Sequence, residues 1–227
     1  GVFLQPTPSA VQVYADGPIQ TTADLAGKTI AVSAGDAPTT TFPIFLDRVG
    51  VPEDQEQQQS LDSAGKIAAM LSGQVDGLIG FAHDQGPNIA NKSGREMRYL
   101  RYSDEGLNFF SNGLIANTST IERSPELVQA MVDATQESFE AAIANPEAAV
   151  KSMVGKDPQT PPESVLLQQW QETIPLLTTA ATEGQAPGVN ADEDWINTIT
   201  TLSEAGLTEV GAEPTKYWDS SFTAGKE

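Results

Sequence analysis

Short strand-like segments, the first of them the β-branched run 29–32, alternate with helix-forming segments between residues 29 and 102, and this alternation constrains the fold more than any other feature. The predicted strands are residues 29–32, 57–61, 75–80 and 97–102, and the predicted helices are 41–49, a helix that Ser63 caps and Gly73 ends, and 84–91. Strands that alternate with helices imply an α/β fold, with a mostly parallel sheet and helices on both of its faces.

The segments on either side of this region have a different character. Residues 2–14 predict a strand, in which Pro6 and Pro8 confine the first half to an edge or a connector. Residues 109–117 predict a fifth strand. From Ser124 onward the pattern is helical only, so the C-terminal region is expected to be a set of helices.

Composition limits the class of protein and its partners. The chain has 227 residues, of which 39% are hydrophobic, enough for a soluble globular core. Only 12 Lys and Arg stand against 31 Asp and Glu, and the resulting net charge of −19 argues against nucleic acid and anionic membrane surfaces as partners. The absence of cysteine excludes disulfides and thiolate chemistry. Neither an apolar run long enough to cross a membrane nor a signal peptide is visible.

Open α/β sheets bind ligands beyond the carboxyl ends of their strands, which directs attention to the loops after the predicted strands. The loop from Ser33 to Thr39 offers hydroxyls and backbone N–H groups, aromatic residues can enclose an apolar part, and Asp and Asn side chains can fix orientation. The predicted ligand-binding residues are Tyr14, Ser33, Gly35, Asp36, Ala37, Thr39, Phe81, Asp84, Tyr102, Asn108 and Asn112. For each of them a structural role, as a helix cap, a core aromatic or a solvated acid, is the open alternative.

His83 is the only histidine and is followed by Asp84. Adjacent residues do not face each other, and no serine or cysteine nucleophile accompanies them, so we interpret His83 as a loop residue rather than a catalytic base. One histidine with scattered acids is poor support for a metal site. We therefore expect no catalytic residues, no metal and no cofactor.

Five segments, in this order, resemble a known family. They are Asp24-Leu-Ala-Gly-Lys-Thr-Ile, residues 45–54 (FLDRVGVPED), Ala69-Met-Leu-Ser-Gly-Gln-Val-Asp-Gly, residues 106–116 (GLNFFSNGLIA) and Asn145-Pro-Glu-Ala-Ala. Together they are similar to motifs of the solute-binding proteins of ABC importers, in the group for nitrate, taurine, sulfonates and thiamine-pyrimidine precursors.

The resemblance implies a two-lobed periplasmic-binding-protein fold of type II. Residues 1–16 would be a remnant of the first lobe and a hinge strand, 17–104 the second lobe, and 105–227 a return strand and helices that pack on the first lobe and hinge. Members of the family have a further first-lobe segment before this point, so the first lobe is expected to be incomplete, as in a fragment or a natural short form.

The resemblance also implies a function. A non-catalytic binding component would capture a small organic solute and deliver it to an ABC permease. The solute would be a thiamine-pyrimidine precursor or related heterocycle, or a sulfonate- or taurine-like anion. A monomer is expected, in the periplasm or another extracytoplasmic location, with a lipid anchor outside this sequence as an open option. The alternatives are a thiamine-pyrimidine synthase-like enzyme, against which the absence of cysteine speaks, and a solute-sensing domain.

Overall fold

The computed structural model describes residues 1–55, 57–158 and 160–223, which form two compact units. The α/β unit is Pro8–Leu107, and the helical unit combines Gly1–Thr7 with the described residues from Asn108 onward. The division by lobes that the resemblance implies stays a prediction, with its bounds at 1–16, 17–104 and 105–227.

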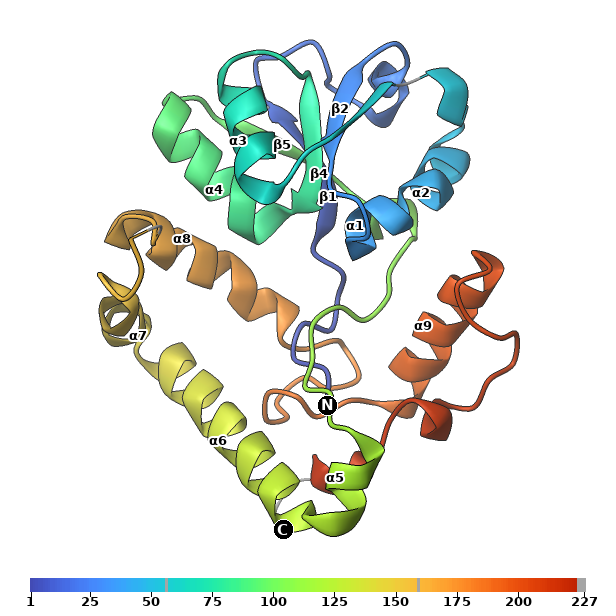
Figure 1. Ribbon diagram of the computed structural model, residues 1–227, viewed down its shortest axis with the longest axis vertical. Helices are drawn as coiled ribbons and strands as arrows, with labels where there is room; N and C mark the ends of the chain where they lie inside the picture. Colours follow the sequence, from blue (N-terminus) through green and yellow to red (C-terminus); the bar gives the residue numbers. More distant parts are fainter. Residues whose placement is uncertain (56, 159, 224–227) are drawn as a thin grey trace. The chain divides into compact units, whose positions relative to one another are not determined.

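The α/β unit is built on one five-stranded sheet in the order β3-β2-β4-β1-β5 (Figure 1). Its strands are β1 (Ser9–Tyr14), β2 (Thr29–Val32), β3 (Gln57–Ser60), β4 (Gly77–Phe81) and β5 (Met97–Arg101). Its helices are α1 (Ala37–Thr40), α2 (Phe42–Val49), α3 (Ser63–Leu71) and α4 (Ala82–Ser93), with short 3₁₀ turns at η1 (Thr22–Leu25), η2 (Glu53–Gln55) and η3 (Ser103–Glu105). The predicted α/β class is confirmed.

The direction of β1 departs from the expected mostly parallel arrangement. Strand β2 is parallel to β3 and β4, whereas β1 is antiparallel to both of its neighbours, β4 and β5. The link from β1 to β2 contains only η1 and no helix long enough to carry the chain back across the sheet. Strand β2 therefore starts at the edge where β1 ends and runs the opposite way.

Helices cover the sheet on both sides, as Figure 1 shows for α3 and α4 against α1 and α2. Ala31 and Leu78 of the sheet share a buried cluster with Met70 of α3 and Ile89 of α4. The helix boundaries follow from local chemistry. Asp62 caps α3 through a 2.7 Å bond from the Gly65 N–H, so Ser63 is its first residue rather than its cap. Helix α4 starts at Ala82, two residues before its predicted start.

The helical unit contains α5 (Thr118–Arg123), α6 (Pro125–Ala144), α7 (Pro146–Met153), α8 (Glu163–Thr173) and α9 (Asp192–Glu204), with 3₁₀ turns at η4 (Ile174–Leu176), η5 (Pro214–Lys216) and η6 (Ser220–Phe222). The N-terminal segment is anchored in it. The Asn190 side chain bonds both the N–H and the carbonyl of Val2, and the Gln5 amide donates to the Leu177 and Val189 carbonyls.

The strand predicted at residues 109–117 is not present, although all nine residues are described. They contribute one isolated bridge, between Val2 and Gly113. The Asn112 carbonyl accepts bonds from the N–H groups of Phe3 and Leu4, so the segment pairs with the first residues of the chain instead of joining a sheet.

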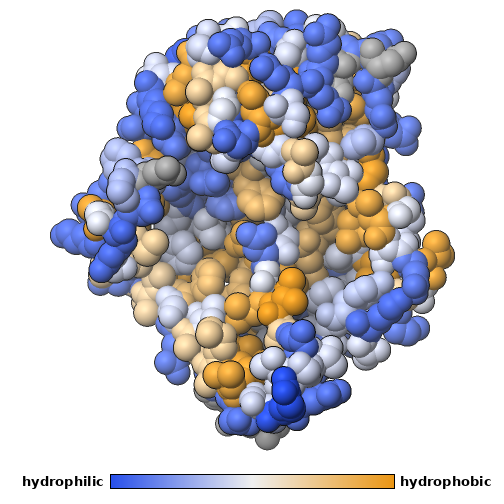
Figure 2. Space-filling model, viewed as in Figure 1, coloured by the Kyte–Doolittle hydropathy of each residue, from blue (hydrophilic) through white to orange (hydrophobic). Residues whose placement is uncertain are grey.

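Helix α6 exposes most of its surface. Of its twenty residues, all of them described, Val132 alone is buried, and Leu127 and Met131 are more than half exposed. Figure 2 shows hydrophobic surface among hydrophilic residues on the side of the helical unit that faces the viewer. Nowhere in the described part of the chain is a helix both long and apolar enough to cross a membrane.

We predict that Leu46→Ala lowers the stability of the α/β unit by about 2–5 kcal/mol, because Leu46 is fully buried and its truncation leaves a cavity. The matched control is Leu71→Ala, at a side chain 39% exposed, with an expected cost under about 1 kcal/mol. All three tryptophans lie in the helical unit, so hydrogen exchange of the β2 and β4 amides is the suitable measurement. Equal losses of protection in the two variants would contradict the prediction.

Candidate functional site

Loops from several strands meet at one edge of the α/β sheet. Parallel strands β2, β3 and β4 end there, and the pairs Ser9–Phe81 and Ala10–Arg101 place the start of β1 and the end of β5 at the same edge. Two backbone bonds of 3.0 Å close this edge, from the Ala82 N–H to the Pro8 carbonyl and from the Tyr102 N–H to the Ser9 carbonyl. This is the edge where open α/β sheets bind ligands.

The loop between β2 and α1 is held by its own side chains. The Asp36 carboxylate caps α1, with Oδ1 2.8 Å from the Thr39 N–H. The Ser33 N–H donates to Thr39 Oγ1 at 3.3 Å, and the Ser33 hydroxyl donates to the Leu61 carbonyl at 2.9 Å. Gly35 has a φ of 82°, in the left-handed region that favours glycine, and Ala37 is exposed at the start of α1. Their contacts with a solute stay a prediction.

Lys66, which our sequence analysis did not identify, lies beneath this loop. Its side chain is 2% exposed, and its ammonium donates to the Ile79 carbonyl at 2.6 Å and lies 3.5 Å from Asp36 Oδ2. Burial lowers the pKa of Lys66, and the negative charges of Asp36 and then Asp84 oppose that shift. The available signal was its spacing: Lys66 lies three and four residues before the buried Ala69 and Met70, on the same face of α3.

The junction of β4 and α4 presents an aromatic pair. The rings of Phe81 and His83 are stacked, with centroids 5.7 Å apart and planes 18° apart. Burial, with a smaller effect from Arg101, lowers the pKa of His83 to about 4. The imidazole is therefore neutral at pH 7, and its buried Nδ1 has no hydrogen-bond partner among the described residues. His83 thus lies in the first turn of α4 and not in a loop, contrary to our interpretation from sequence.

Asp84 lies beside this pair, exposed in the first turn of α4. The surrounding protein raises the pKa of its carboxyl by desolvation, and the Lys66 ammonium partly reverses the shift. Asp36, Lys66 and Asp84 therefore form one charged cluster, which three different elements of the α/β unit bring together.

Two of the predicted aromatic residues have other roles in the structure. Tyr102 is fully buried, stacks on Phe45 with centroids 4.4 Å apart, and donates its hydroxyl to the Pro38 carbonyl. Tyr14 pairs with Met97 at the opposite edge of the sheet, five residues along β1 from Ser9. At about 3.3 Å per residue this is roughly 16 Å away, so the structure does not bring Tyr14 to the site.

Asn108 and Asn112 belong to the helical unit. The Asn108 side chain accepts a 2.9 Å bond from the Thr7 N–H, and the Asn112 carbonyl anchors Phe3 and Leu4. Both residues are exposed, so a contact with a solute stays a prediction for them.

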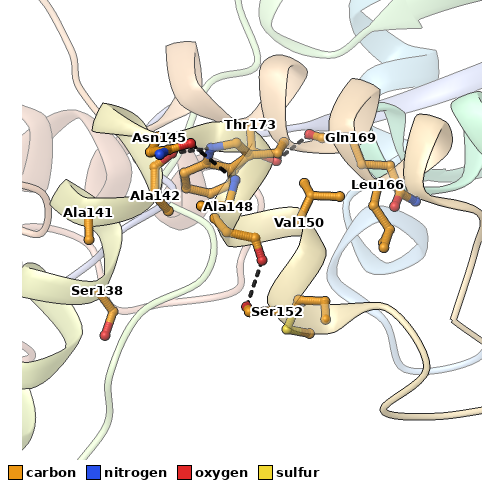
Figure 3. A pocket seen from close by; sticks show the side chains of 13 residues that line it. Ser138, Ala141, Ala142, Asn145, Ala148, Val150, Ser152, Leu166, Gln169 and Thr173 are labelled. Carbon is orange, nitrogen blue, oxygen red and sulfur yellow. Dashed lines mark hydrogen bonds between the residues drawn. The ribbon is translucent and has the colours of Figure 1, made fainter.

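A separate cavity of about 560 Å³ lies between α6, α7 and α8 of the helical unit (Figure 3). Polar side chains that line it form hydrogen bonds with the protein's own backbone. The Asn145 side chain caps α7, the Trp170 indole donates to the Ala142 carbonyl, and the Ser152 and Thr173 hydroxyls donate to carbonyls of their own helices. This cavity can take apolar groups, but these polar side chains are already committed and do not orient a polar solute.

The arrangement at the sheet edge suits binding more than covalent chemistry. The Ser33 hydroxyl donates to a carbonyl rather than to an imidazole, so it is not activated as a nucleophile. Across residues 1–55, 57–158 and 160–223, no three His, Cys, Asp or Glu side chains are placed to hold a metal ion together.

Comparisons with known proteins agree on the fold. The riboflavin-binding protein RibY of Chloroflexus aurantiacus is 23% identical over 227 residues, which cover 98% of this chain and 64% of RibY. The solved structure of the periplasmic sulfonate-binding protein SsuA of Methylobacillus flagellatus is 20% identical, with a TM-score of 0.61 over 94% of this chain and 63% of that one. The periplasmic aliphatic sulphonate-binding protein SsuA of Escherichia coli is 19% identical, with a TM-score of 0.66 over 93% of this chain and 70% of that one.

The chain spans less than two thirds of the length of RibY and of the Methylobacillus protein. The structural likenesses show the predicted periplasmic-binding-protein fold. Residues 1–149 match the family described as NMT1/THI5 like. The chain belongs to the NMT1/THI5-like family.

Proposed function

We propose that this chain is the solute-binding part of an ABC importer, and that a small organic solute binds at the carboxyl edge of the α/β sheet. The observation that carries the proposal is the convergence, at this one edge, of the Ser33–Thr39 loop, the Asp36–Lys66 pair and the Phe81–His83 rings. The family and the fold support it. The permease partner, the extracytoplasmic location and the monomeric state are parts of the same proposal.

The chemistry of the edge favours a flat heterocycle as the solute. Stacked rings at Phe81 and His83 offer an apolar surface for another planar ring. The imidazole of His83 is neutral and so adds no charge beside this surface, which suits an uncharged heterocycle. A thiamine-pyrimidine precursor or a flavin has this chemistry, and a relative named as riboflavin-binding is in keeping with it.

Thermal or chemical unfolding of the chain with a panel of solutes tests the proposal. The panel contains riboflavin, hydroxymethylpyrimidine, a formylaminopyrimidine, taurine, alkanesulfonates and nitrate. A solute present at about 100 times its dissociation constant should add roughly 2.7 kcal/mol to the free energy of unfolding. A heterocycle is expected to give the largest shift. A cooperative transition that no member of the panel moves would contradict the proposal for this chain.

We predict that Phe81→Ala weakens binding of the heterocycle about fivefold, because a lost stacking contact is worth on the order of 1 kcal/mol. Asp84→Ala should also weaken binding without unfolding the chain. Tyr14→Ala is the control, since Tyr14 lies at the opposite edge of the sheet. Fluorescence quenching of riboflavin measures the affinity. Equal affinity of Phe81→Ala and the wild type would place the solute elsewhere.

The pH dependence of binding gives an independent prediction. An ordinary histidine takes up its proton near pH 6.5, but the lowered pKa of His83 delays protonation to about pH 4. Affinity for an uncharged heterocycle should therefore stay constant between about pH 8 and 5.5 and fall only as the pH approaches 4. The measurement is a pH series of riboflavin titrations, with His83→Phe as the variant that lacks the titration. A step in the affinity of the wild type centred near pH 6.5 would contradict it.

A further inference from the structure

Lys66 is the one buried cation of the site among the described residues, and its ammonium lies inside the protein rather than at the surface. The Lys66 ammonium is 2% exposed, whereas its partner Asp36 is 32% exposed. A solute approaching the loop after β2 therefore meets the carboxylate first, and the ammonium lies behind it. Asp84 adds a second exposed carboxylate to the same cluster.

The geometry of Asp36 fixes this order of charges. Its Oδ1 accepts from the Thr39 N–H at 2.8 Å, so the carboxylate is held at the start of α1 and cannot swing away without uncapping the helix. Its Oδ2 faces Lys66 at 3.5 Å. On the inner side the ammonium is held by the Ile79 carbonyl at 2.6 Å.

We propose that the Asp36–Lys66 pair sets the charge selectivity of the site: it admits uncharged heterocycles and rejects anions such as sulfonates. This inference rests on the proposed function and decides between the two solute classes that the sequence left open. An anion at the edge would lie against Asp36 and Asp84, and the Lys66 charge that could attract it is already neutralised by Asp36.

Arg101 is another cation of this edge, at the end of β5. Its guanidinium carbon lies 5.1 Å from the centroid of the Tyr99 ring, and its charge contributes to the lowered pKa of His83. If Arg101 served as an anion anchor, the wild-type chain would bind sulfonates, and the test below includes that outcome.

The decisive substitution is Asp36→Asn in the full chain. Asparagine keeps an oxygen that can cap α1 but removes the negative charge, so the Lys66 charge is no longer neutralised. We expect at least a tenfold gain in affinity for butanesulfonate and little change for riboflavin. The matched control is Asp62→Asn, the same substitution at the cap of α3, whose carboxylate bonds the Gly65 N–H. The control should gain nothing.

The double variant Asp36→Asn/Lys66→Met completes the experiment. If Lys66 is the source of the gain, removing its ammonium should abolish sulfonate binding again, while circular dichroism checks that each variant is folded. Calorimetric titration with riboflavin and butanesulfonate, each against all four proteins, gives the affinities.

Each result bears on the inference. A wild type that binds riboflavin and not butanesulfonate, with a gain in Asp36→Asn that the double variant loses, supports it. A wild type that binds butanesulfonate as tightly as riboflavin overturns it even if Asp36→Asn does not fold, and leaves the solute-binding function standing. A folded Asp36→Asn without any gain also overturns it. A wild type that no solute of the wider panel stabilises overturns the proposed function, and the inference with it.

Discussion

Strand β1 is paired on both sides, and the α/β unit depends on this double pairing. Ala10, Val11 and Gln12 each have one partner in β4 and another in β5. A shift of one residue in either ladder would turn the buried side chains of β1 to the opposite face. It would also separate the end of β4 from the start of β1, where Phe81 now lies opposite Ser9. The register of one strand therefore places the loops of the candidate site.

The charged cluster at this edge has a desolvation cost, because the Lys66 ammonium is buried. That cost makes the presence of the cluster informative about function. Moving an ammonium out of water is unfavourable unless hydrogen bonds and an opposite charge compensate. Lys66 has both, from the Ile79 carbonyl and Asp36, and these contacts join α3, β4 and the loop before α1. An apolar residue at position 66 would pack without this cost. The arrangement therefore points to a requirement for fixed positions of charge at this edge of the sheet, which agrees with a role in solute recognition.

The sequence predicted local structure well where short-range chemistry decides it. The strands predicted at 29–32, 75–80 and 97–102 correspond to β2, β4 and β5, and Gly50 ends α2 in the left-handed conformation. It failed where distant contacts decide. Residues 109–117 have strand-forming composition, but they form only separate backbone hydrogen bonds with Gly1–Leu4. No local sequence pattern specifies that partner segment. The direction of β1 and the inward position of Lys66 likewise depend on packing between elements. Residue types alone therefore indicated Asp36 and Asp84 at the candidate edge but not Lys66, the third member of the charged cluster.

The division of the helical unit between Gly1–Thr7 and the residues after Leu107 has a consequence for biosynthesis. The α/β unit is continuous, so it can fold as soon as residue 107 has left the ribosome. Val2 and Gln5, in contrast, wait for Asn190, Val189 and Leu177, their hydrogen-bond partners. At about 5–20 residues per second, Val2 and Gln5 remain without those partners for roughly 10–40 seconds. The segment Gly1–Thr7 is thus synthesised before the α/β unit but reaches its place after it, and the hydrophobic Val2, Phe3 and Leu4 are side chains that a nascent-chain chaperone would find exposed in the meantime.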